Sequence, residues 1–171
     1  MSANKQFLSA SIVRAVQLNA VANWLEAELK KHTAALELVI VGEIAKADPT
    51  FNRNRIERSQ RTHALFAAVE NEIISSFREV RAATEAHFKE LSSILVDKIA
   101  ADHAQHFDSA ADKISLSGIV QTPVLGATLK DWCDRLAGDL NFRFQQQMRQ
   151  GIGQDETLQQ LIARVKGNSR G

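Results

Sequence analysis

The sequence predicts an all-α protein, in which a long antiparallel helical hairpin is followed by a smaller two-helix C-terminal element. Three observations predict this fold class. The 171 residues include only two prolines and eight glycines, too few for the many turns of a β-rich fold. Apolar residues recur at helical steps of three and four over two long stretches. No glycine or proline interrupts the chain between Pro49 and Gly118.

The first helix is expected over residues 9–47, where Asp48-Pro49 ends it, and the second over residues 53–106. The stripe of the first helix is Leu18, Val21, Leu25, Leu29, His32, Leu36 and Ile40. The stripe of the second is Val69, Ile73, Phe77, Val80, Thr84, Phe88, Leu91, Leu95 and Ile99. Both stripes repeat every 11 residues, which predicts nearly straight helices packed side by side. The short link between them predicts an antiparallel pair. These two helices form the first expected domain, residues 1–107.

Residues 108–127 are polar and rich in turn residues, and they predict an extended connector with a short edge strand. The element that follows, residues 128–171, should begin with a helix capped by Thr128 and Asp131. Its expected apolar stripe is Leu129, Trp132, Leu136, Leu140, Phe144 and Met148. We expect Gly151 to end this helix in a left-handed conformation, and Asp155 to cap a last helix that stops at Gly167. The structural hinge then comprises Gly151, Gly153 and Gly167.

Composition excludes some classes of partner and compartment. The formal net charge is +1, so the chain is not a bulk polycation. Its only cysteine, Cys133, cannot form an internal disulfide and is expected to be a packed thiol. The first twelve residues lack a signal-peptide pattern, and no run approaches the roughly 20 apolar residues that cross a bilayer. We therefore expect a protein made in a cytoplasm and not inserted in a membrane.

Four arginines crowd the start of the second helix: Arg53, Arg55, Arg58 and Arg61. Cations at a helix N-terminus oppose the helix dipole by a few tenths of a kcal/mol each. A negatively charged partner, either protein or nucleic acid, would account for that cost, so these arginines are the candidate partner-binding residues. The alternative is an exposed turn that tolerates the cost.

No pattern in the sequence predicts catalysis, a metal site or a cofactor, and we do not expect an enzyme. His103 and His106 are three residues apart but have no third strong ligand nearby, which favours a polar helix end. His32 stands in an apolar stripe and is expected to be partly buried and hydrogen-bonded. Gly151-Ile-Gly153 follows a helix and leads into no Gly-Lys-Ser or Gly-Lys-Thr, so it is not a phosphate loop.

The order helix, glycine turn, helix over residues 124–167 resembles the Mu F-like head morphogenesis family, the minor head proteins of tailed bacteriophages. The residues that carry the resemblance are Gly126, Thr128, Leu129, Trp132, Arg149, Gly151, Ile152, Gly153, Leu158, Ile162, Val165 and Gly167. The N-terminal hairpin resembles that family only in being helical and alanine-rich.

This resemblance implies a virion component of the phage head, made in the host cytoplasm and associated with the portal. It implies a role in head morphogenesis or in genome packaging and delivery. The expected partners are the portal protein or other head proteins, with packaged DNA as a nonspecific contact. Family members often continue into a C-terminal α/β domain that these 171 residues do not include, so no activity of such a domain is expected here. The competing hypothesis is a non-viral helical interaction module, such as an adaptor or signalling bundle.

Overall fold

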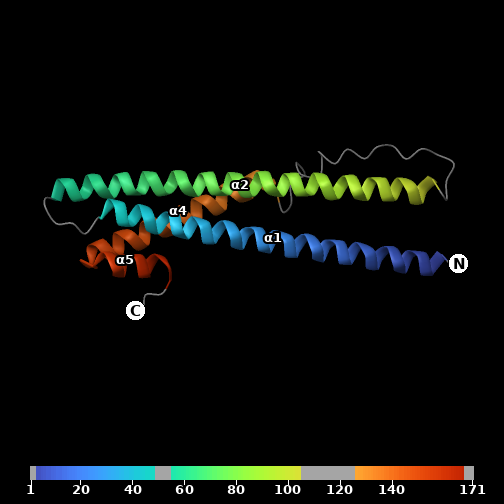
Figure 1. Cartoon of the computed structure of the whole chain (residues 1–171), viewed down its shortest axis with the longest axis horizontal. Helices are drawn as coiled ribbons and strands as arrows, with labels where there is room; N and C mark the ends of the chain where they lie inside the picture. Colours follow the sequence, from blue (N-terminus) through green and yellow to red (C-terminus); the bar gives the residue numbers. More distant parts are fainter. Residues whose placement is uncertain (1–2, 49–54, 105–125, 168–171) are drawn as a thin grey trace. The chain divides into compact units, whose positions relative to one another are not determined.

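The computed structural model describes residues 3–48, 55–104 and 126–167, and the predicted all-α fold is confirmed in these ranges. Two long helices, α1 (Ala3–Ala47) and α2 (Arg55–Ala104), precede the shorter α4 (Leu129–Gly153) and α5 (Leu158–Val165), as Figure 1 shows. Most of the predicted connector, residues 108–125, lies outside the described residues together with its expected strand.

The chain divides into two compact units, Met1–Ala35 and Leu36–Gly171. Within the first unit, polar side chains of α1 contact each other one helical turn apart. Lys30 Nζ lies 2.6 Å from a carboxylate oxygen of Glu26, and His32 Nε2 lies 3.1 Å from Glu28 Oε1. His32 is half-buried and hydrogen-bonded, as the sequence predicted.

The second unit contains one hydrophobic core to which all four described helices contribute. Its buried members are Leu36, Ile40 and Ile44 of α1, Leu65, Phe66, Val69 and Ile73 of α2, Ala137, Phe144 and Met148 of α4, and Leu161 of α5. The closest helix pairs among the described residues are α2 with α4, and α4 with α5. The core therefore includes residues from both sides of the predicted connector, because the apolar face of α4 lies on α2.

The predicted stripe of α2 is confirmed where side chains are described. Val69 and Ile73 are fully buried, and Val80 and Thr84 are nearly so. Thr84 is the one polar residue among these four, and its hydroxyl donates a 2.7 Å hydrogen bond to the carbonyl oxygen of Val80. That bond satisfies the hydroxyl within the helix, so a threonine can occupy an apolar stripe.

The predicted stripe of α4 is wrong in its first half. Trp132 is 37% exposed and Leu136 is 49% exposed, whereas the buried residues of α4 are Cys133, Ala137, Phe144, Met148 and Gly151. From Trp132 to Met148 the predicted stripe consists of steps of four, each of which turns by about 40° around the helix, so its early members leave the face that Phe144 and Met148 present to the core. The buried face of α4 combines steps of three and four residues. The small side chains of Cys133 and Ala137 lie on this face, toward α2.

Candidate functional site: an arginine clasp, a close-packed C-terminal element and two hollows

The structure separates the four predicted partner-binding arginines. Arg53 lies outside the described residues, and Arg55 begins α2 with a side chain that is also outside them. Arg61 is exposed, whereas the Arg58 side chain is only 25% exposed and turns toward the end of α4. Of the four, Arg58 and Arg61 have described side chains, and Arg61 is the one of these two that is exposed as predicted.

Arg58 clasps the turn between α4 and α5. Its Nη2 donates a 3.0 Å hydrogen bond to the carbonyl oxygen of Ile152 and lies 3.3 Å from Oδ1 of Asp155. A cation is favourable there, because the last carbonyl groups of a helix carry partial negative charge. Arg58 therefore ties the start of α2 to the end of α4. The sequence did not predict this structural role, since Arg58 and Asp155 are 97 positions apart.

A hollow of about 490 Å³ opens beside this clasp. Its lining residues are Arg58, Ser59, Thr62, His63, Phe66, Arg149 and Ile152. The Arg149 guanidinium carbon lies 5.5 Å from the centre of the Phe66 ring, within the range of a cation–π contact, and Arg149 Nη2 donates to Gln145 Oε1 at 3.2 Å. Arg149, one of the residues that carry the family resemblance, is therefore held beside α2.

The predicted role of Gly151 as a left-handed helix end is wrong. Gly151 and Gly153 both lie in the last turn of α4 and have helical conformations. Among the described glycines, only Gly126 and Gly167 have a positive φ. What requires glycine at position 151 is the close approach of α5. A Cβ atom there would overlap Leu161 Cδ2 and lie 2.5 Å from a carboxylate oxygen of Glu156. Gly153 has nothing within 4 Å of such an atom.

The chain reverses after α4 at Asp155 and not at a glycine. Asp155 has a φ of 52°, and Asp and Asn tolerate this region better than other non-glycine residues. The predicted cap of the last helix is also corrected. Thr157 is the N-cap of α5, with its side chain bonded to the backbone of Gln160, while Gly167, at φ 74°, follows α5. The Thr128–Asp131 capping box at the start of α4 is present as predicted.

A network around Arg164 holds α5 against α4. Arg164 Nε donates to Glu156 Oε2 at 2.9 Å, and Nη2 also contacts the other oxygen of that carboxylate. The same guanidinium reaches Gln154 at 2.9 Å and Gln147 at 3.3 Å. The hydrogen bond from Arg164 lowers the pKa of Glu156 below its ordinary value. Glu156 and Arg164 of this network lie beside Gly151, where α5 packs closely against α4.

A second hollow, of about 500 Å³, lies between α2 and α4. It is lined by Glu70, Ile74, Phe77, Arg78, Arg81, Lys130, Cys133, Asp134, Ala137, Gly138 and Asn141. Burial raises the pKa of the Cys133 thiol, which reduces its thiolate fraction and its reactivity. The predicted packed thiol is thus a buried residue at the wall of this hollow.

No cluster of three or more metal-ligating side chains occurs within the described ranges. His103 lies near the end of α2 with a side chain outside the described set, and His106 lies outside it altogether. Among the described helices none is long and apolar enough to cross a membrane.

Comparison of the chain with protein-family models, with curated proteins and with solved structures gave no match.

Proposed function

We propose that this chain is a structural component of a tailed-bacteriophage head, a minor head protein that acts beside the portal in head morphogenesis or genome packaging and delivery. The proposal rests on the resemblance of residues 124–167 to that family. The observation that supports it is that residues carrying the resemblance shape one packed element.

Each part of this element has a defined physical role. Thr128 starts α4 with a capping box, and Gly151 leaves the space that α5 fills. Leu158, Ile162 and Val165 pack against the core from α5. Several residues that carry the resemblance therefore have a packing or capping role in this element, although Trp132 is 37% exposed and Gly153 has open space around it. These roles support the proposal that residues 124–167 act as one structural unit.

The alternative, a non-viral helical interaction module, is favoured by a separate observation. Leu136 and Phe142 of α4 are 49% and 69% exposed, and Leu38 of α1 is 71% exposed. Apolar side chains of this size are suited to burial against any protein partner. Both hypotheses thus describe a protein that works by binding other proteins, and they differ in the identity of the partner.

The deciding experiment is to purify heads from cells that carry the corresponding prophage and to probe them for this chain. In parallel, the isolated chain is mixed with the portal ring encoded in the same genome. We expect the chain in heads and a stable complex with the ring after nuclease treatment. If the chain is missing from heads and does not bind the ring, the interaction-module hypothesis replaces the phage one. Binding that disappears with nuclease would identify DNA as the bridge.

The Arg61 side chain supplies a sharper version of this test. Since Arg61 is exposed, Arg61→Glu should change stability by no more than about 0.5 kcal/mol. If the arginine cluster contacts an acidic surface of the partner, the variant should bind the ring less well than wild type, and the difference should shrink at high salt. Arg143→Glu, which makes the same charge change at an exposed position of α4, is the matched control. Equal binding of Arg61→Glu and wild type at low salt would assign the cluster to a solvated turn.

A further inference from the structure

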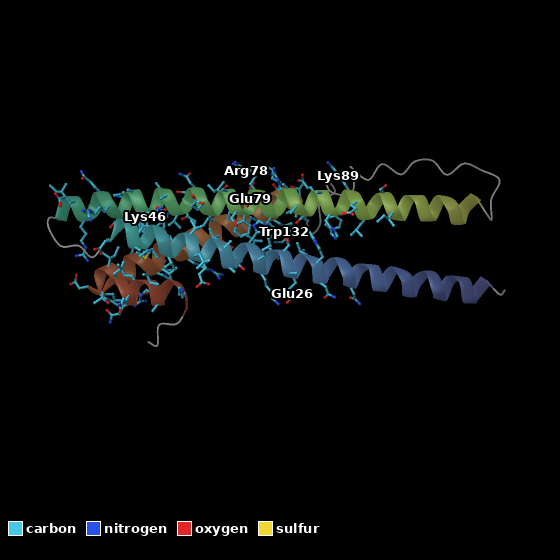
Figure 2. All side chains as sticks on the ribbon, in the orientation of Figure 1. Glu26, Lys46, Arg78, Glu79, Lys89 and Trp132 are labelled. Carbon is cyan, nitrogen blue, oxygen red and sulfur yellow. The ribbon has the colours of Figure 1, made fainter. Side chains whose placement is uncertain are left out.

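An exposed row on α2 combines an apolar centre with opposite charges on either side. Ile74 is 44% exposed, and Glu70 and Arg78 stand one turn before and one turn after it. Residues four apart lie on the same side of a helix, so the three form one continuous row. Arg78, labelled in Figure 2, projects away from the ribbon of α2. Among the described residues neither Glu70 nor Arg78 makes an ion pair.

We infer that this row, Glu70–Ile74–Arg78, is a contact surface for a second copy of this chain. The row is complementary to itself when it is turned by 180°. In an antiparallel pair with its two-fold axis at Ile74, Glu70 of each copy meets Arg78 of the other, and the two Ile74 side chains meet at the centre. A two-fold interface requires such a self-complementary patch.

The neighbouring positions are compatible with this arrangement. Over residues 67–81 the two-fold axis at Ile74 pairs each position with the one equally far on the other side. Glu70 with Arg78 is the pair in which both residues are exposed; exposed Ala67 is paired with half-buried Arg81, and exposed Asn71 with half-buried Phe77. None of them brings like charges together, which would weaken the association.

The α2–α4 hollow provides space beside the row. Ile74 lines this hollow together with Ala137 and Gly138 of α4. A Cβ atom at Gly138 would meet nothing within 4 Å, so the wall of the hollow is open at that point. The row is therefore bordered on one side by this hollow, in which Lys130 and Asp134 of α4 also lie. This inference concerns self-association and does not depend on the proposed function.

The test uses charge reversal in the full chain and measures association by sedimentation equilibrium at low salt. Wild type should form dimers. Glu70→Arg and Arg78→Glu should each dimerise at least about tenfold more weakly, because each substitution places two like-charged pairs at the interface. The decisive sample is an equimolar mixture of the two variants. In the mixed pair both contacts are again Arg with Glu, so heterodimers should form where neither variant dimerises alone.

Two further variants complete the experiment. Ile74→Glu should abolish dimerisation, since it places two carboxylates on the axis. Glu90→Arg makes the same charge change as Glu70→Arg at another exposed position of α2 and should leave the dimer unchanged. A wild-type chain that stays monomeric at the highest soluble concentration would overturn the inference. So would a mixture that associates no better than its components, or a Glu90→Arg variant as weak as Glu70→Arg.

Discussion

Replacing Gly151 with alanine tests whether glycine is needed there for the close approach of α5. The added methyl group would overlap Leu161, which is fully buried, and would press on a carboxylate that Arg164 holds in place. Neither neighbour can move freely, because Leu161 belongs to the core and Glu156 is bonded to a fixed guanidinium. Overpacking of this kind costs about 1–3 kcal/mol.

A second term has the opposite sign. Gly151 is helical, and alanine in place of a helical glycine stabilises by about 0.5–1 kcal/mol. The net loss for Gly151→Ala is therefore about 1 kcal/mol, and Gly153→Ala is the matched control. Gly153 lies two residues further along the same turn and has open space at its Cβ position, so alanine there should be neutral or stabilising. The difference between the two variants isolates the steric cost.

The assay is thermal unfolding of both variants followed by circular dichroism. For a chain of this length 1 kcal/mol shifts Tm by about 2–4 °C, so Gly151→Ala should melt roughly 2–12 °C below Gly153→Ala. Amide hydrogen exchange in α5 should also be faster in Gly151→Ala than in Gly153→Ala, because α5 would detach from α4 before the rest of the core unfolds. Equal Tm values for the two variants, or a higher Tm for Gly151→Ala, would refute the close-approach argument. That result would mean that the contact with α5 does not require glycine at position 151.

Two other predictions concern the contacts that hold the C-terminal element. Arg58→Ala should lower the free energy of unfolding by about 1–2 kcal/mol, because the carbonyl of Ile152 and the end of α4 lose a charged donor. Arg61→Ala should stay within about 0.5 kcal/mol in the same urea titration, and an equal effect of both substitutions would contradict the clasp. Glu156 links stability to pH, since its pKa in the folded chain lies below the ordinary value of 4.5, chiefly through the hydrogen bond from Arg164. The unfolded chain then binds more protons, so this contribution is complete above pH 4.5 and is lost as pH falls through the folded pKa. In Glu156→Gln the free energy of unfolding should fall less steeply as the pH is lowered below 4.5. An unchanged slope would show that other carboxylates cause the loss of stability in acid.

Local sequence signals predict the helices of this protein. The spacing of apolar residues, the Asp48-Pro49 stop and the Thr128–Asp131 capping box are local signals, and the end of α1 and the start of α4 follow them. The start of α1 was expected at residue 9 but lies at Ala3. The core positions of α2 from Val69 to Thr84 also followed from periodicity, because a long stripe averages over many turns.

Which helix surfaces meet depends on contacts between residues that are far apart in the sequence. Trp132 and Leu136 looked like core residues, but α4 approaches α2 through the smaller Cys133 and Ala137, and helix spacing cannot show which of two adjacent faces is nearer a neighbour. Gly151 was predicted to be a left-handed helix end, but glycine is required there because Leu161 of α5 packs closely against it. Arg58 was expected on the surface, yet its partners are 94 and 97 residues away. Helix propensity and capping depend on residues that are close in the sequence. Packing and ion pairing depend on residues that are close in space, and many of these come together only when the chain folds.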